Sequence, residues 1–341
     1  MKPYKYSVFI GRFQPFHFGH LLSLKFAESI SENIIVLIGS SFYPRTIKNP
    51  FTFEERKEHL LSVIQSENIH TPVSIIPLED YPYSNNTWIA IVQEKVNNIV
   101  KNSSDKIAIV GAEKDASSSF LRWFPSWVFE HSEYDKNSGL HATKIRDIFF
   151  SEENPLYFKS ALPSSVYSFI ESYRNKDWWN ELKTEFSFIQ KYKKSWESAP
   201  YKPTFVTVDA VVFQCGYILL VERKSYPGKG LLALPGGFIK ENETLEEGMI
   251  RELKEETSIK VPIPVILGSI KDRKVFDSPE RSLRGRTITH AFYIQFPNSN
   301  PLPKIKGGDD AKHCFWVPLS DIKKETLFED HWDIIMCNGF L

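Results

Sequence analysis

The chain has 341 residues, a length that favours about two domains rather than one. Its 42 lysines and arginines balance 42 aspartates and glutamates without a basic tail or a long block of one sign, so we expect no nucleic-acid partner. The three scattered cysteines argue against a disulfide framework or a structural zinc site, and without a secretion signal or about 18 successive apolar residues we expect a cytoplasmic protein with no membrane segment.

Short apolar runs alternate with amphipathic segments of helical length across the first half of the chain. Thr52, with Glu55 three residues later, has the pattern of a capping box that opens a helix. The alternation predicts an α/β domain with a Rossmann-like, doubly wound parallel sheet. The expected strands are residues 6–10, 33–40, 73–78 and 106–112, and the expected helices are residues 20–31, 52–66 and 87–101.

An aromatic-rich helix is expected next, because large apolar side chains repeat there at steps of three or four residues. This stripe either packs within the chain or forms a homo-oligomer contact, and the sequence leaves both open. It comprises Trp179, Leu182, Phe186, Ile189 and Trp196. We expect a first domain over residues 1–196, a linker at 197–203 and a second domain over 204–341.

The second half is rich in strands, which are expected at residues 205–213, 217–223, 289–296 and 313–319. A glycine-rich turn and one acidic helix interrupt them. The pattern predicts an α+β domain, with no internal repeat of the first half.

The stretch GRFQPFHFGH, residues 11–20, follows the first expected strand, at the edge of a parallel sheet where phosphate is usually bound. Gly11 belongs to the turn, and Gly19 would let a phosphate or base approach the backbone. His17 and His20 can direct two imidazoles at one phosphate chain, and Arg12 adds a positive charge. The alternative is that the glycine only turns the chain and the histidines are ordinary surface groups.

A second stretch, HATKIR at residues 141–146, supplies Thr143 and Arg146 at the start of another helix. The two stretches together resemble the HxGH nucleotidyltransferases, most closely the nicotinamide-mononucleotide adenylyltransferase branch. The resemblance covers about residues 4–175 and implies transfer of AMP from ATP to nicotinamide mononucleotide, giving NAD and pyrophosphate.

The same resemblance implies roles for individual residues. His17, His20, Arg12 and Arg146 would stabilise charge on the phosphates together with Mg²⁺. Trp88 would stack on the nicotinamide ring and Lys48 would face phosphate, although relatives often have arginine at the position of Lys48, and serine or glycine where Ala142 stands. An adenylyltransferase for phosphopantetheine or a nucleotide-sugar precursor is the alternative, and it would not require Trp88.

The acidic helix carries the most specific pattern, within residues 236–259. Thr244 and Glu247 form a capping box, so the helix begins there. At about 100° per residue, Glu252, Glu255 and Glu256 share one face, while Met249, Ile250 and Leu253 turn toward the core. Such close carboxylates favour a hard cation, Mg²⁺ or Mn²⁺, between them.

This spacing, with Gly237, Glu243 and Arg251, resembles the Nudix hydrolases over about residues 203–341. The resemblance implies a Glu243–Arg251 brace and attack of metal-activated water on a diphosphate, with Glu256 in the catalytic set. Ser258 stands where the family usually has glycine.

The general base of the hydrolase is left open by the sequence. Asp309 and Asp310 follow two glycines in a loop, where they are either catalytic, with Asp310 preferred, or part of a surface turn. His313 beside Cys314 is a weak metal pattern, and ordinary strand chemistry is the alternative.

Both signatures in one chain resemble the bifunctional proteins that fuse these two enzymes, which implies ADP-ribose as the hydrolase substrate, cleaved to AMP and ribose 5-phosphate. The loop before residue 289 offers Arg281, Arg284 and Arg286 to that substrate, with Arg286 preferred. The alternatives are cleavage of another nucleoside diphosphate derivative and a sensor of NAD metabolites that regulates transcription. The latter would require a winged-helix segment after the Nudix part, which we do not expect from this sequence.

Overall fold

The computed structural model describes residues 2–113, 116–132, 141–298, 301–307 and 311–337. The chain divides into two compact units, Met1–Thr184 and Glu185–Leu341, each with its own sheet. The division falls within the long helix α7, Asp177–Lys194. In the part of the chain that is described, no helix is both long and apolar enough to span a membrane.

The first unit contains a five-stranded parallel sheet with the order β3-β2-β1-β4-β5. This order places β1 at the centre and reverses direction beside it, which confirms the predicted doubly wound fold. The edge strand β5 was not among the predicted strands. The strands are β1 Tyr4–Gly11, β2 Ser31–Ile38, β3 Val73–Pro77, β4 Ile107–Gly111 and β5 Val128–His131.

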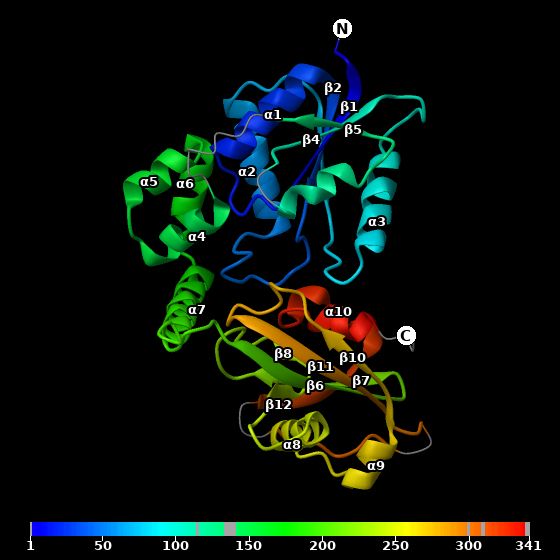
Figure 1. The fold of residues 1–341 in the computed structure, drawn as a ribbon. Helices are drawn as coiled ribbons and strands as arrows, with labels where there is room; N and C mark the ends of the chain where they lie inside the picture. Colours follow the sequence, from blue (N-terminus) through cyan, green and yellow to red (C-terminus); the bar gives the residue numbers. More distant parts are fainter. Residues whose placement is uncertain (1, 114–115, 133–140, 299–300, 308–310, 338–341) are drawn as a thin grey trace. The chain divides into compact units, whose positions relative to one another are not determined.

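Helices α1 and α2 lie on one face of this sheet and α3 on the other (Figure 1). The capping box predicted at Thr52 is present, with the Thr52 hydroxyl accepting the Glu55 N–H and the Glu55 carboxylate accepting the Thr52 N–H. The third helix begins at Asn85, earlier than expected, because Ser84 caps it. These helices are α1 Phe18–Ile30, α2 Phe53–Ser66 and α3 Asn85–Asn97.

Beyond β5 the first unit continues as short helices that pack on one another. Phe149 of α4 stacks on Phe158 of α5 at 5.8 Å between ring centroids, and α6 packs against α2. Four residues of the expected apolar stripe on α7 are buried. The helices are α4 Ala142–Ser151, α5 Pro155–Ala161 and α6 Ser164–Tyr173, and the buried stripe residues are Trp179, Leu182, Phe186 and Ile189.

The second unit is built on a mixed sheet with the main order β10-β11-β6-β7-β12, which confirms the α+β domain. Strands β6 and β11 are parallel, and the other pairs are antiparallel. The short strands β8 and β9 pair with β7 and β6, respectively. The strands are β6 Thr204–Gln214, β7 Tyr217–Arg223, β8 Leu232–Ala233, β9 Gly236–Phe238, β10 Ile270–Phe276, β11 Arg286–Gln295 and β12 Ala311–Pro318.

Helices α8, Leu245–Thr257, and α10, His331–Met336, lie on opposite faces of this sheet (Figure 1). A third helix, α9, spans Ile263–Gly268. On the α8 side, alternate residues of β6 form a core with the helix. That core contains Val208, Ala210, Val212, Met249 and Leu253, all at most 1% exposed.

Candidate functional site

The turn after β1 folds tightly enough to hold two histidines against each other. A Cβ at Gly11 would lie 2.7 Å from the ring of Phe13, which itself has a positive φ of 51°. The rings of His17 and His20 stack with 3.7 Å between centroids. The His17 N–H donates to Nδ1 of His20 at 3.2 Å, so a neutral His20 carries its proton on Nε2.

Gly19 lies against the imidazole of His17. A Cβ at this position would lie 3.0 Å from Cε1 of His17, so the missing side chain makes room for the buried imidazole. The glycine thereby positions His17.

The two sequence stretches expected at the phosphate site meet in the structure. Arg146 of α4 is 7% exposed and donates from Nη1 to the carbonyl of Gln14 at 2.7 Å. Its Nη2 lies 3.1 Å from the Thr143 hydroxyl, to which it also donates. Gln14 in turn bonds both the N–H and the carbonyl of Phe51. This places the turn, the start of α4 and the segment before α2 around one point.

The two remaining cationic residues of this expected site are accessible. Arg12 is exposed at the carboxyl end of β1, and Lys48 is partly exposed in the segment that leads to Phe51.

Sequence reasoning missed Arg56, which ties the carboxyl ends of β1 and β2 together. Its side chain is 1% exposed and donates to the carbonyls of Arg12 and Gly39 at 2.6 Å each, and to that of Ser40 at 3.2 Å. Burial lowers the pKa of Arg56 to about 10, so it stays charged at neutral pH. An arginine in the first turn of an amphipathic helix gives no sequence signal for this role.

Trp88 on α3 lies partly buried among other aromatic rings. It meets Phe120 at 5.7 Å and Trp123 at 6.0 Å between ring centroids, both edge to face. It also packs against the core on the α3 face of the sheet. The indole therefore contributes to packing, whatever ligand it contacts.

In the second unit, Arg251 forms the centre of a carboxylate network. It donates to both oxygens of Glu243, at 2.9 and 2.5 Å, to Glu252 at 2.7 Å and to Glu255 at 3.0 Å. It also bonds the carbonyl of Phe238 at 3.1 Å, which fixes the glycine-rich strand β9 beside α8. The hydrogen bonds from Arg251 hold the pKa of Glu243 at about 2, so this carboxylate remains ionised.

The carboxylates of α8 occupy one side of the helix, but they point to different partners. Glu256 accepts the N–H of Gly236 at 3.0 Å, and a Cβ at Gly237 would lie 2.6 Å from Glu252. Within the described residues, no three acidic, imidazole or thiol side chains converge on one point as an ion site would require. Arg251 holds Glu252 and Glu255 instead.

A divalent cation nevertheless fits this set of donors. Burial raises the pKa of Glu256 to about 8, with Glu252 adding to the effect, and burial also raises the pKa of Glu252. Such carboxylates favour a nearby cation, since its charge restores their ionised form. Glycine at position 237 lets β9 pass this close to Glu252, because a Cβ there would lie 2.6 Å from the carboxylate.

The expected general base and the His313–Cys314 pair do not form a described metal site. Asp309 and Asp310 lie outside the described residues. On β12, His313 is exposed, whereas Cys314 packs against the cluster that contains Val221 and Phe328. Adjacent strand residues face opposite sides of a sheet, so these two side chains do not converge on one ion.

The arginine loop before β11 has three distinct environments. Arg281 is buried in a two-point ion pair with Asp330, at 2.9 Å for each contact. The guanidinium carbon of Arg284 lies 4.8 Å from the ring centroid of Phe238 in β9. Arg286 donates to the carbonyl of Asp277 and lies 3.7 Å from its carboxylate.

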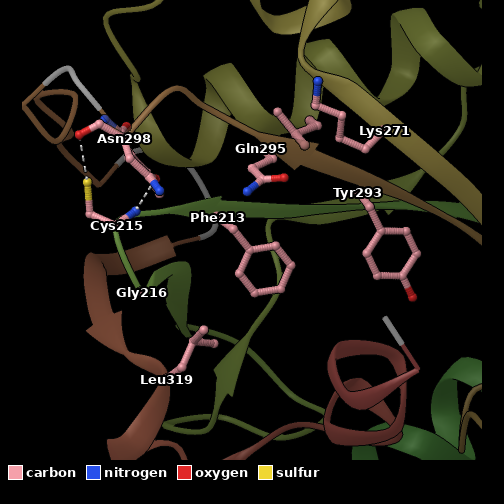
Figure 2. A pocket seen from close by; sticks show the side chains of 10 residues that line it. Phe213, Cys215, Gly216, Lys271, Tyr293, Gln295, Asn298 and Leu319 are labelled. Carbon is pink, nitrogen blue, oxygen red and sulfur yellow. Dashed lines mark hydrogen bonds between the residues drawn. The ribbon is translucent and has the colours of Figure 1, made fainter. Parts of the chain in front are cut away.

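A pocket of about 210 Å³ lies at the carboxyl ends of β6 and β11 (Figure 2). Phe213, Tyr293 and Lys271 line it, and Cys215 is held beside it by hydrogen bonds to Asn298. None of the expected site residues lines this pocket. The glycines of β9 pair with Val208 and Asp209, well before the carboxyl end of β6.

Family models match the two halves of the chain separately. The Cytidylyltransferase-like model matches residues 8–148, and the NUDIX domain model matches residues 203–336. The nicotinamide/nicotinic acid mononucleotide adenylyltransferase of Acinetobacter baylyi is 33% identical over 189 residues, which cover 54% of this chain and 95% of that protein. The ADP-ribose pyrophosphatase of Methanocaldococcus jannaschii is 38% identical over 130 residues, 38% of this chain and 70% of that protein.

Solved structures match nearly the whole chain. A bifunctional NMN adenylyltransferase/ADP ribose pyrophosphatase from Francisella tularensis has a TM-score of 0.92 and 40% identity, and the match covers 98% of each chain. A structure of such a protein from the same organism with AMP and a manganese ion has a TM-score of 0.91 and 39% identity, again over 98% of each chain.

Proposed function

Because the chain belongs to the family of bifunctional NMN adenylyltransferases/ADP-ribose pyrophosphatases, we propose that its first unit joins ATP and nicotinamide mononucleotide and its second unit cleaves ADP-ribose. We take residues 1–196 and 204–341 as the two catalytic domains and 197–203 as their linker. The products are NAD with pyrophosphate, and AMP with ribose 5-phosphate, respectively.

The adenylyltransferase site is supported above all by the hydrogen bond from Arg146 to Gln14, because it unites two stretches 132 residues apart. The mononucleotide phosphate attacks the α-phosphorus of ATP in line, so no protein nucleophile is required. His20 presents Nε2–H to the phosphates, His17 supports it, and Arg12, Lys48, Arg146 and the Thr143 hydroxyl stabilise the developing charge. ATP enters as its Mg²⁺ complex.

In the hydrolase, Glu252, Glu255 and Glu256 would hold a divalent ion, Mg²⁺ in our proposal, which lowers the pKa of a bound water and so supplies the nucleophile. Arg251 keeps Glu243 ionised and anchors β9 through the Phe238 carbonyl. Gly236 orients Glu256 through its N–H. Asp310 remains the proposed general base.

A substrate panel tests both assignments. The pure protein with ATP, Mg²⁺ and nicotinamide mononucleotide should form NAD, and we expect ADP-ribose with Mg²⁺ or Mn²⁺ to yield AMP. ADP-ribose should exceed NAD, dinucleoside polyphosphates and 8-oxo-dGTP in kcat/KM by at least about tenfold, a difference of about 1.4 kcal/mol in transition-state binding. A preference for a triphosphate would overturn the hydrolase assignment, and absence of NAD would overturn the other.

A further inference from the structure

The loop that carries Arg284 is fastened from beneath by buried charges. Arg281 and Asp330 form their ion pair with side chains only 3% and 7% exposed. The N–H of Leu283 lies 3.4 Å from the carboxylate of Glu329, which accepts it. Burying these charges is costly unless they are paired, so the pairing fixes this segment in one conformation. The loop is therefore a rigid support for Arg284.

Arg284 projects from this support over the strand that borders the glutamates. Its Nε and its backbone N–H both donate to the Ser282 hydroxyl at 3.4 Å. Its guanidinium lies against Phe238, the residue after Gly237, and Gly237 is the glycine that touches Glu252. A fixed positive charge thus stands over β9, the strand whose Gly236 N–H bonds Glu256.

A second arginine, Arg223, approaches the same place from the end of β7. Its Nε donates to the carbonyl of Pro227 at 2.8 Å, and its guanidinium carbon lies 3.9 Å from the ring centroid of Phe328. Burial lowers the pKa of Arg223, and the positive charge of Arg284 lowers it further. Glu256 and Glu329 act in the opposite direction. Phe328 adjoins Glu329, which accepts the N–H of Leu283 beside Arg284, so Arg223 and Arg284 flank the same stretch, residues 328–329.

Two guanidinium groups that border the strand beside a metal-binding helix can donate together to one anion. We propose that Arg223 and Arg284 bind the diphosphate of the hydrolase substrate from the side opposite the α8 glutamates. The inference rests on the proposed function of this site and deepens it, because it names the groups that recognise a diphosphate-bridged nucleotide.

The neighbouring arginines are less suited to this role. Arg281 is fully engaged with Asp330, and Arg286 is engaged with Asp277 at the start of β11. In the described hydrogen bonds, the side chain of Arg284 donates only from Nε. The two terminal nitrogens of its planar guanidinium can therefore donate to phosphate oxygens. The sequence by itself favours Arg286 among the three arginines for contact with the substrate.

The test compares Arg284→Ala with Arg273→Ala, a matched control. Arg273 also lies over a phenylalanine ring, 4.9 Å from the centroid of Phe292, but its partner is Glu246 in the first turn of α8. We expect Arg284→Ala to raise KM for ADP-ribose at least about tenfold with little change in kcat, since ground-state binding is lost. Arg284→Lys should fall between wild type and alanine, and Arg273→Ala should match wild type.

Arg223→Lys, which keeps the charge of this buried site, should also raise KM, because a lysine lacks the planar fork. Unfolding curves establish that each variant is folded. An unchanged KM in both Arg284→Ala and Arg223→Lys, an equal rise in Arg273→Ala, or a rise confined to Arg286→Ala would overturn the inference.

Equilibrium binding of ADP-ribose in EDTA separates this inference from the proposed function. If the wild-type protein fails to cleave ADP-ribose, the proposed hydrolase function fails. A tenfold loss of ADP-ribose affinity in Arg284→Ala, absent in Arg273→Ala, would still support diphosphate recognition. Equal affinities in the two variants would reject it.

Discussion

At the scale of single residues, the packing of two histidines and a glycine shapes the turn after β1 in the first unit. His17 is 1% exposed and stacks against His20, which is partly exposed. A Cβ at Gly19 would lie 3.0 Å from the His17 ring, so a larger residue there would crowd this imidazole. The HxGH spacing therefore stacks two imidazoles against each other, with the glycine leaving room for the buried one.

Trp88 provides a prediction at this scale. Trp88→Ala should raise KM for nicotinamide mononucleotide more than KM for ATP, if the indole stacks on the pyridine ring as proposed. It should also lower the free energy of unfolding by about 2 kcal/mol, because the ring packs against Phe120 and Trp123. Trp88→Phe keeps an aromatic ring and should preserve most of both properties. Steady-state kinetics measure the two KM values, and urea unfolding measures the stability. Equal rises in KM for nicotinamide mononucleotide and for ATP would show that Trp88 contributes only to packing.

At the scale of elements, α8 is defined by its two ends. The capping box at Thr244 and Glu247 is formed as expected. At the other end Ser258 adopts a left-handed conformation, with φ 46° and ψ 30°, and its N–H bonds the carbonyl of Lys254. A serine pays a steric penalty there that a glycine avoids.

Replacing that residue should stabilise the helix. We expect Ser258→Gly to increase the free energy of unfolding by about 0.5–1 kcal/mol without changing hydrolysis, since the side chain lies beyond the glutamates. Ser258→Ala keeps the Cβ and hence the strain, so it should give no such gain. Denaturant titration measures the free energy of unfolding of both variants. An equal increase in Ser258→Ala would contradict the explanation by left-handed backbone strain.

The contact between α2 and α6 makes the first unit sensitive to acid. His59 of α2 is fully buried beside Tyr173 of α6, with 3.2 Å between Nε2 and the hydroxyl. Burial lowers the pKa of His59 from 6.5 to about 4. Between pH 6.5 and about 4, His59 is therefore protonated in the unfolded chain but neutral in the folded chain. Stability is fully present above pH 6.5 and falls as the pH drops toward 4.

The shift corresponds to at most about 3 kcal/mol lost across that window. Unfolding free energies measured from pH 7.5 to 5 should show the fall in wild type, and His59→Gln should flatten it. A slope that the substitution leaves unchanged would assign the acid sensitivity to other groups.

At the scale of the whole molecule, each unit has its own sheet, core and proposed site. The adenylyltransferase residues all belong to Met1–Thr184, and the hydrolase residues all belong to Glu185–Leu341. Because separate cores fold around separate sites, damage to one site should leave the other intact.

Reciprocal substitutions test this independence. His20→Ala should abolish NAD formation and preserve ADP-ribose cleavage, whereas Glu256→Gln should do the reverse. Glu256→Gln should cost little stability, since the raised pKa of about 8 means that the neutral acid already predominates at neutral pH without a cation. Both activities are assayed on each folded variant, and loss of both in either variant would contradict the two-site description.

Sequence alone determined the features that depend on neighbouring residues. The strands β1–β4, β6, β7, β11 and β12, the capping boxes at Thr52 and Thr244, and the arrangement of α8 follow from periodicity and spacing of a few residues. Met249 and Leu253 are buried while Glu255 is exposed, as the helical period requires. Such patterns can be read locally, because one turn of helix or one strand fixes them.

Tertiary structure alone decided which distant groups meet. Arg281 pairs with Asp330 across 49 residues, Arg146 reaches Gln14 across 132, and Arg56 joins the ends of two strands. Edge strands such as β5 also escaped prediction, because four residues with mixed exposure show little periodicity. A charged residue in a loop or on a helix has the same local pattern whether it is solvated or buried, so only the folded contacts distinguish Arg284 from Arg281 and Arg286.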